Sequence, residues 1–361
     1  MVTGPGLLHT SNSCWKMKLV RKTALGKSGL EIPQMIFGTS YLGNLYRELA
    51  YAEKLELIRG WFQCVEKPVV IDTAGKYGAG LALEVIGRGL SDLGIDPEDV
   101  VISNKLGWYR VPLRGAEPGF EPGVWVNLEH DCEQRFGHEG ILQCFEQGNE
   151  LLGGMYRAQL VSIHDPDEYL IAAESPPLRE QRKEEVLESY RALFELKRKG
   201  EVKAVGIGSK DWKIIREFYA QVPFDWVMFA NSYTLMKHPQ EIREFLGQLQ
   251  RDGVGIINSA LFHGGFLTGG TQFDYREVDP FSEEGKKLYS WRNKFNLVCV
   301  EHQVDPGDAC IQFGLSHPAI AAIALNTSKP EKMIRNAEII QRKIPEAFWT
   351  ALMEKGLLDR K

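Results

Sequence analysis

The chain has 361 residues, 43% hydrophobic and 25% charged, a balance that excludes wholesale disorder and collagen-like sequence. Its 43 Lys and Arg residues against 48 Asp and Glu residues give a formal net charge of −5, so the sequence offers no basic excess for a nucleic-acid partner. The sequence also has no run of roughly 18–20 apolar residues that could serve as a membrane span, and we expect no membrane partner.

Short apolar runs alternate with helical patterns along the chain. The predicted strands are 33–38, 69–72, 100–105, 159–164, 205–209, 225–231, 254–259 and 320–324. The predicted helices are 50–65, 83–92, 140–152, 184–199, 212–219, 239–251, 283–300, 308–315, 330–342 and 346–355. Such alternation indicates a parallel sheet buried on both faces. Eight units predict an α/β protein with a closed (β/α)8 TIM barrel; an open doubly wound sheet is the alternative, although no G-x-G-x-x-G follows the first strand.

The domain organisation follows from where this alternation starts and breaks. We expect residues 1–16 to be a disordered N-terminal extension and residues 17–361 to form a single barrel domain. Segment 107–139, after the third strand, is rich in Gly, Pro and aromatic residues. We interpret it as a long loop insertion that forms a pocket wall or lid; a surface loop with packed aromatics is the alternative. The six cysteines include no CxxC pair, so we expect reduced thiols, a cytoplasmic location and no metal site.

Polar residues stand at the ends of three early strands. Asp72, Lys105 and His164 end their strands, and Tyr77 follows Asp72 by five positions. Each alone fits a structural role, such as a helix cap or a packed histidine. In a barrel, however, the carboxyl ends of the strands converge on the face where catalysis occurs. A nearby ammonium lowers a tyrosine pKa from about 10 by roughly 1–3 units, so Lys105 is expected to activate Tyr77, with Asp72 holding Lys105 and His164 orienting a substrate oxygen. Together the four predict acid–base chemistry between C–OH and C=O.

The sequence resembles the aldo-keto reductase family over nearly all of residues 18–340. The motifs that carry the resemblance are 72–78 (DTAGKYG), 103–105 (SNK), 162–164 (SIH), 205–209 (VGIGS), Asn231, 259–261 (SAL), 330–332 (PEK) and Asn336. The resemblance implies the (β/α)8 fold and a nicotinamide-dependent oxidoreductase. It also implies that Tyr77 is the general acid–base, with Asp72, Lys105 and His164 as its partners.

A narrower resemblance points to the aldose 1-dehydrogenase branch of this family, which includes enzymes that act on aldoses, L-galactose and pyridoxal. It rests on 164–167 (HDPD), on the insertion after Lys105 and on 136–142 (FGHEGIL). It implies oxidation of the C1 hydroxyl of a cyclic hemiacetal to a lactone, with hydride transfer to NAD(P)⁺. The partner would be a small sugar or similar hemiacetal, and a homo-oligomer stays open. The alternatives are an NADPH-dependent carbonyl reductase and a barrel that binds the cofactor without turnover.

The resemblance also assigns cofactor and substrate residues. The cofactor set is Gly38, Thr39, Ser209, Asn231, Ser259, Leu261, Asn326, Lys332 and Asn336. Within this set Ser209 and Asn231 match the pair that holds the nicotinamide carboxamide, and Asn336 matches the residue at the adenine. The expected substrate residues are Tyr41, Trp108, Tyr109 and Trp125.

Three positions depart from the family pattern. Lys210 stands where many members have Asn, and Asn258 stands where many stack an aromatic ring on the nicotinamide. Asn326 replaces a Lys that often pairs with the 2′-phosphate of NADP. We therefore expect NAD to be preferred, with NADP as the second choice because Lys329 and Lys332 remain within reach of a phosphate.

Overall fold

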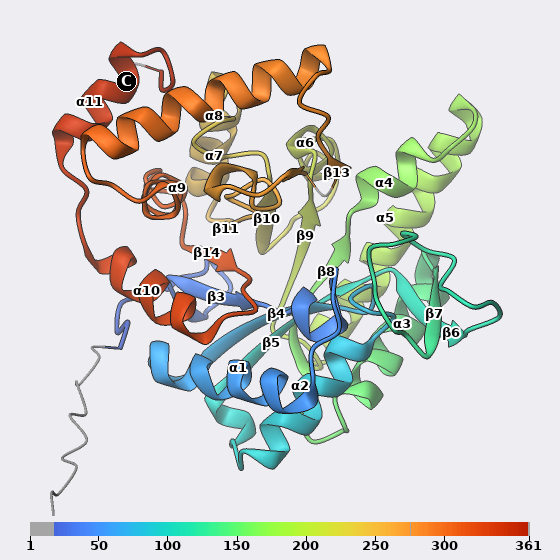
Figure 1. The fold of residues 1–361 in the computed structure, drawn as a ribbon. Helices are drawn as coiled ribbons and strands as arrows, with labels where there is room; N and C mark the ends of the chain where they lie inside the picture. Colours follow the sequence, from blue (N-terminus) through green and yellow to red (C-terminus); the bar gives the residue numbers. More distant parts are fainter. Residues whose placement is uncertain (1–17, 275, 360–361) are drawn as a thin grey trace, which may run out of the picture.

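A closed barrel of eight parallel strands forms the centre of the molecule, as predicted (Figure 1). The computed structural model describes residues 18–274 and 276–359. The barrel strands, in their order around the barrel, are β3 (Met35–Gly38), β4 (Val69–Ala74), β5 (Val100–Leu106), β8 (Ala158–His164), β9 (Ala204–Ser209), β10 (Trp226–Ala230), β11 (Gly255–Ser259) and β14 (Ala322–Leu325). Strand β14 pairs in parallel with β3 and closes the barrel.

Helices surround the barrel and cover the outer faces of its strands (Figure 1). They are α1 (Tyr51–Cys64), α2 (Leu81–Asp92), α3 (Gly137–Leu151), α4 (Pro166–Ile171), α5 (Pro176–Arg198), α6 (Trp212–Tyr219), α7 (Gln240–Asp252), α8 (Glu283–Glu301), α9 (Pro306–Gly314), α10 (Pro330–Gln341) and α11 (Glu346–Glu354). Short 3₁₀ turns lie at η1 (Ser40–Gly43), η2 (Pro97–Asp99) and η3 (Phe266–Thr268). Because both faces of each strand are covered, β4 and β5 are buried along their whole length.

A short antiparallel hairpin precedes the barrel. It consists of β1 (Lys22–Ala24) and β2 (Glu31–Pro33). Leu25 and Ile32 are fully buried and pack with residues inside the barrel, among them Trp226. The hairpin therefore contributes to the core inside the barrel.

The insertion is a loop whose two ends pair with each other. Strands β6 (Trp108–Pro112) and β7 (His130–Gln134) form an antiparallel hairpin, with residues 113–129 between them. This hairpin lies beside α3 (Figure 1), where the Arg110 amide donates to Gln147 at 2.7 Å. Pairing satisfies backbone groups that a loop of this length would leave to solvent.

Three further features complete the description. A two-stranded ribbon, β12 (Gln272–Phe273) and β13 (Arg276–Glu277), lies between η3 and α8. Within residues 18–274 and 276–359, no helix is long and apolar enough to cross a membrane. The predicted extension, residues 1–16, lies outside the described residues.

Candidate active site

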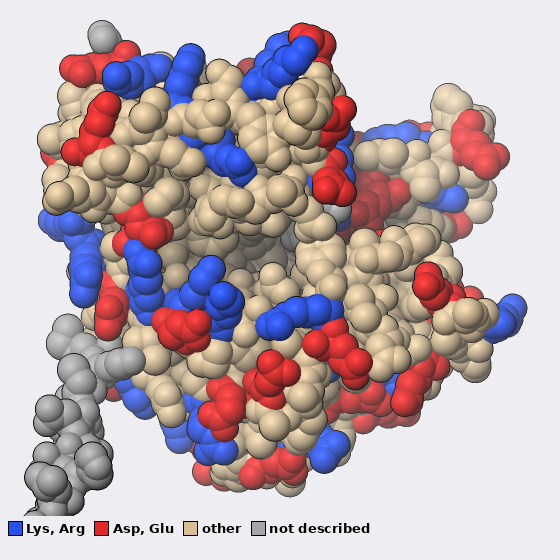
Figure 2. All heavy atoms as spheres, in the orientation of Figure 1, with Lys and Arg blue, Asp and Glu red and all other residues tan. Residues whose placement is uncertain are grey.

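The four residues predicted to act together lie on one cleft. Asp72 is on β4, Lys105 on β5 and His164 ends β8, while Tyr77 is on the turn after β4. The strand register pairs Ala74 with Lys105, so these strands present their polar residues at the same end of the barrel. All four line a cleft of about 560 Å³. Figure 2 shows a hollow in the middle of the molecular face, with Lys and Arg side chains along its rim.

A buried ion pair forms the floor of the site. Lys105 Nζ lies 2.5 Å from Asp72 Oδ2, and the two side chains are only 4% and 5% exposed. Ser103 Oγ is 3.5 Å from the second Asp72 oxygen, and the Thr39 hydroxyl donates to the Asp72 carbonyl at 2.9 Å. A charge removed from water needs such partners, because an unpaired buried charge is strongly destabilising. The pair therefore fixes an ammonium group at this point of the cleft.

Tyr77 is held among three side chains. Lys105 Nζ lies 4.7 Å from the centroid of its ring, and the His164 ring meets it edge-on at 5.6 Å. The Trp125 ring lies 5.9 Å from it on a tilted plane. Burial raises the pKa of Tyr77 well above its usual 10, and the nearby carboxylate of Asp72 raises it further. This differs from the lowering we expected from Lys105. The physical reason is that Asp72 compensates the Lys105 charge and the site is poorly hydrated.

The backbone around Tyr77 is fixed by a close approach of two glycines. Gly78, at φ +62°, packs against Gly43 of η1. A Cβ on Gly43 would lie 2.7 Å from the carbonyl carbon of Tyr77, and one on Gly78 would lie 2.4 Å from the carbonyl oxygen of Gly43. Only glycine at both positions allows this contact. The turn that carries Tyr77 is thus seated directly on the turn after β3.

His164 is uncharged in this setting. Burial, followed by the positive charges of Lys105 and Lys76, holds its pKa well below the usual 6.5. Its Nε2 lies 3.7 Å from Asp165 Oδ2, and its Nδ1 has no hydrogen-bond partner among the described residues. A neutral imidazole keeps one N–H donor, so His164 can hydrogen-bond a substrate oxygen without adding a charge.

The cleft also brings together most of the residues expected at the cofactor. Eight of the nine line it: Gly38, Thr39, Ser209, Ser259, Leu261, Asn326, Lys332 and Asn336. Asn326 Nδ2 donates to Ser40 Oγ at 2.5 Å, and a Cβ on Gly38 would lie 3.1 Å from Asn326 Cβ. Lys329, Lys332 and Arg335 line the cleft too. A cleft lined by glycine backbone and several cations fits a dinucleotide, because phosphates bind such donors.

Asn231 and Asn258 are placed differently from these eight. Asn231 follows β10 at φ +55° and lines a neighbouring groove, which shares Lys210 with the cleft. Its buried Oδ1 has no hydrogen-bond partner among the described residues. Asn258 is fully buried and donates to the carbonyls of Tyr233 and Gly314. Asn258 thus packs into the core and offers no surface for stacking on a nicotinamide.

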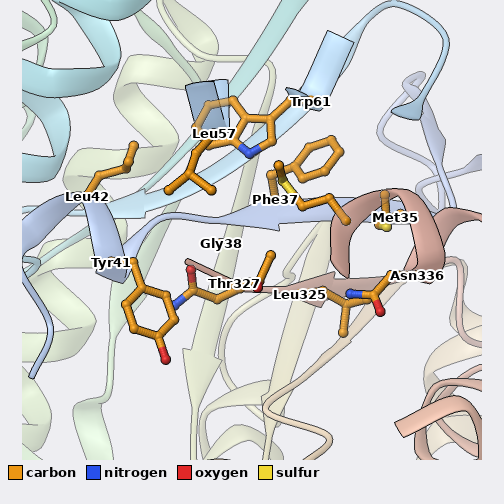
Figure 3. A pocket seen from close by; sticks show the side chains of 12 residues that line it. Met35, Phe37, Gly38, Tyr41, Leu42, Leu57, Trp61, Leu325, Thr327 and Asn336 are labelled. Atoms are coloured by element: carbon orange, nitrogen blue, oxygen red, sulfur yellow. The ribbon is translucent and has the colours of Figure 1, made fainter. Parts of the chain in front are cut away.

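A second, much smaller cavity of about 10 Å³ adjoins the cleft and shares lining residues with it (Figure 3). Apolar residues of β3 and α1, including Phe37, Leu57 and Trp61, form one side of it. Asn336 and Tyr41 lie at its opposite side and also line the cleft. The Phe37 and Trp61 rings stack with centroids 5.6 Å apart. The cleft wall around Asn336 therefore rests on a packed apolar layer.

Three aromatic residues of the insertion do not line the cleft. Of the expected substrate residues, Tyr41 lines the cleft, whereas Trp108, Tyr109 and Trp125 are absent from its described lining. The Trp108 ring lies 5.0 Å from Lys76 Nζ, and Tyr109 packs under the Arg135 guanidinium at 3.7 Å. Trp125 is 7% exposed and reaches the site through the Tyr77 ring.

Sequence reasoning missed several charged residues of the site. Lys76 is buried next to Tyr77 and pairs with Glu121 and Glu168. Arg335, which lines the cleft together with Lys329 and Lys332, pairs with Asp305 and with Asp308, both at 3.1 Å. The partners are far apart along the chain, and no motif spacing connects them. The one available signal was Lys76, a lysine next to the predicted catalytic Tyr77, and it points only to the cluster of Lys76 with Glu121 and Glu168.

Comparisons with known proteins identify the family. The model of the Aldo/keto reductase family matches residues 34–356. Pyridoxal 4-dehydrogenase of Microbacterium luteolum is 27% identical, over 95% of this chain and 99% of its own. D-threo-aldose 1-dehydrogenase of a Pseudomonas species is 25% identical, over 93% and 97%.

A solved structure supports the fold independently. The glycerol dehydrogenase of Gluconobacter oxydans superposes with a TM-score of 0.66 at 15% identity, covering 94% of this chain and 97% of its own. That identity supports the architecture alone. The family match over residues 34–356, with the dehydrogenase relatives, shows that the chain belongs to the aldo/keto reductase family and is an NAD(P)-dependent oxidoreductase.

Proposed function

We propose that this enzyme oxidises the C1 hydroxyl of a cyclic hemiacetal, such as an aldose, to a lactone. The relatives named above act on pyridoxal and on D-threo-aldoses. Both kinds of compound carry an aldehyde and a hydroxyl in one molecule and can close into a cyclic hemiacetal. The observation that carries the proposal is that Tyr77, His164 and the Lys105–Asp72 pair line the same cleft.

Tyr77, Lys105 and His164 each have a separate role in the proposed proton transfer. Tyr77, as the phenolate, accepts the proton of the C1 hydroxyl, while the hydride leaves C1 and the C1–O bond becomes a carbonyl. The buried Lys105 ammonium stands 4.7 Å from the Tyr77 ring and opposes the carboxylates that disfavour the phenolate. Neutral His164 donates to the reacting oxygen and orients it.

A nicotinamide cofactor supplies the hydride acceptor for this reaction. We propose that Ser209 and Asn231 hold its carboxamide, that Ser259, Leu261, Gly38 and Thr39 line its path, and that Asn336 meets the adenine. NAD is the proposed preference over NADP, because Asn326 is neutral and bonded to Ser40, and Arg335 is already paired with two aspartates. Lys329 and Lys332 make NADP the second choice.

The test is turnover of a panel of aldoses and pyridoxal with NAD⁺ and with NADP⁺, with the product identified by NMR. We expect at least one hemiacetal to give its lactone with stoichiometric formation of NAD(P)H. Turnover confined to reduction of open-chain aldehydes and ketones would instead identify a carbonyl reductase. Cofactor binding without any turnover would identify a non-catalytic barrel.

A further inference from the structure

A buried lysine connects the insertion to the site. The Lys76 side chain is 4% exposed, and its Nζ lies 2.7 Å from Glu121 of the insertion and 2.7 Å from Glu168 of α4. The ring of Trp108, also in the insertion, lies 5.0 Å from the same Nζ. A lysine this well buried needs such partners to stay charged. Lys76 therefore joins the insertion to α4 at a point one residue before Tyr77.

The ion pairs continue from Lys76 to the neighbour of His164. Glu168 binds Lys76 through one oxygen and Lys210 through the other, at 2.5 Å. Lys210 Nζ also lies 3.3 Å from Asp165, which directly follows His164. A chain of alternating charges thus runs from the insertion, past Tyr77, to the end of β8. Its members, in order, are Glu121, Lys76, Glu168, Lys210 and Asp165.

Glu121 also accepts a hydrogen bond from a side chain that packs on Tyr77. The Trp125 indole N–H donates to the Glu121 carboxylate at 2.7 Å, and the Trp125 ring packs on the Tyr77 ring at 5.9 Å. The same loop is anchored to the turn after β3, because the Tyr46 amide donates to Val124 at 2.8 Å. Losing the Lys76 contact would leave Glu121 without its cation and free Trp125 to shift.

We propose that Lys76 is a positioning residue for Tyr77, and that the insertion serves as a brace for the reacting tyrosine. Lys76 fixes Tyr77 through the adjacent backbone and, by way of Glu121 and Trp125, through the face of its ring. This gives a role to two aromatic residues of the insertion that do not line the cleft, since Trp125 contacts Tyr77 and Trp108 contacts Lys76. The inference rests on the proposed role of Tyr77 and on no particular substrate.

The experiment compares Lys76→Met, which keeps length and removes charge, with Lys76→Arg, which keeps the charge. Misplacing a reacting group by about 1 Å can cost on the order of 10²-fold in rate. We expect Lys76→Met to lower kcat by about 10- to 100-fold while the KM for the cofactor changes less than about twofold, and Lys76→Arg to recover most of the loss. The kinetic isotope effect on kcat, measured with substrate deuterated at the reacting carbon, is expected to rise in Lys76→Met because hydride transfer becomes slower.

The isotope effect separates positioning from a general loss of folded enzyme. A smaller folded fraction lowers kcat and leaves the isotope effect as in the wild type, and that result would overturn the proposal. So would a kcat for Lys76→Met within about twofold of the wild type. If Lys76→Met does not fold, Glu121→Gln, which keeps an acceptor for Trp125, must show the same direction in both readouts; wild-type values there would also overturn the proposal.

A matched control and the Tyr77 variant complete the design. Lys183 on α5 pairs with Glu217 at 2.8 Å on the outside of the barrel, and Glu217 keeps Arg179 as a second partner. Lys183→Met is expected to leave kcat and the isotope effect unchanged. Tyr77→Phe tests the role of Tyr77 separately. An active Tyr77→Phe overturns that role, whereas an inactive Tyr77→Phe beside an unaffected Lys76→Met overturns only the role of Lys76.

Discussion

Lys105 and Asp72 form a buried ion pair, 2.5 Å apart, at the floor of the cleft beside Tyr77. We expect Lys105→Met to lower the free energy of unfolding by about 3–5 kcal/mol, because it leaves the Asp72 carboxylate buried without its cation. It should also lower kcat by ~10²-fold or more, since the phenolate loses the ammonium that lies 4.7 Å from its ring. Chemical denaturation and steady-state kinetics measure the two effects.

The double variant Lys105→Met/Asp72→Asn serves as the control for this pair. It removes both charges, so most of the lost stability should return while activity stays low. Equal stability losses in the single and double variants would show that packing, rather than an uncompensated charge, causes the destabilisation.

We expect oxidation to accelerate as the pH rises from about 7 to 10. Oxidation needs the Tyr77 phenolate, and burial together with Asp72 and Asp165 holds the pKa of Tyr77 above its usual value, against the opposing charge of Lys210. The phenolate fraction therefore grows with pH throughout this range. In the reductive direction the neutral phenol is the proton donor, so that rate should be flat near neutral pH. A flat or falling oxidative profile of kcat/KM would contradict this assignment.

Asp167 predicts a pH dependence of stability. Its carboxyl is buried, its Oδ1 has no hydrogen-bond partner among the described residues, and desolvation raises its pKa from 3.8 to about 6. Since the folded-state pKa lies above the unfolded value, this group lowers the free energy of unfolding as pH rises from about 4 to 6. At ~1.4 kcal/mol per pKa unit, the loss is at most ~3 kcal/mol.

Asp167→Asn should therefore stabilise the protein above pH 6 and leave its stability unchanged below about pH 4. Urea denaturation of both proteins across this range measures the difference. The Asp211 amide, which donates to Asp167 at 3.2 Å, would still find an acceptor in the variant. A constant difference at all pH values would show that the ionisation of Asp167 is not its cause.

Cofactor choice can be tested at one position. We expect the wild type to have a higher kcat/KM with NAD⁺ than with NADP⁺, and Asn326→Lys to raise the value for NADP⁺ about tenfold or more, because a charged hydrogen bond contributes about 1.5–3 kcal/mol. Asn326→Gln, which adds no charge, is the control. A clear NADP⁺ preference in the wild type would mean that Lys329 or Lys332 already binds the 2′-phosphate.

The barrel could be predicted because each strand carries its own signal. Runs such as 69–72 and 100–105 are continuously apolar and then polar, and this local pattern alone indicates a strand buried on both faces. The insertion hairpin was not predicted, because β6 and β7 pair across a long loop and neither alternates clearly between apolar and polar residues. The helix α4 was not predicted because its six residues are too few to show a helical periodicity.

The sequence allowed us to predict the part of the site whose residues stand at the ends of barrel strands. Asp72, Lys105 and His164 come together because parallel strands share one carboxyl end, a rule that needs no tertiary knowledge. The pairs of Lys76 with Glu121 and Glu168 depend on how a loop and a helix fold back over the barrel. The pKa of Tyr77 could not be predicted either, because burial is the largest cause of its shift and the sequence does not show how deeply Tyr77 is buried.

In the proposed reaction, Tyr77 transfers the proton that accompanies hydride transfer. The most direct measurement is the kcat of Tyr77→Phe with an oxidisable hemiacetal, together with its dissociation constant for the cofactor. We expect a loss of ~10²-fold or more in kcat with an almost unchanged dissociation constant, because the hydroxyl acts on the reacting oxygen. A variant that keeps more than about a tenth of the wild-type kcat would contradict this expectation.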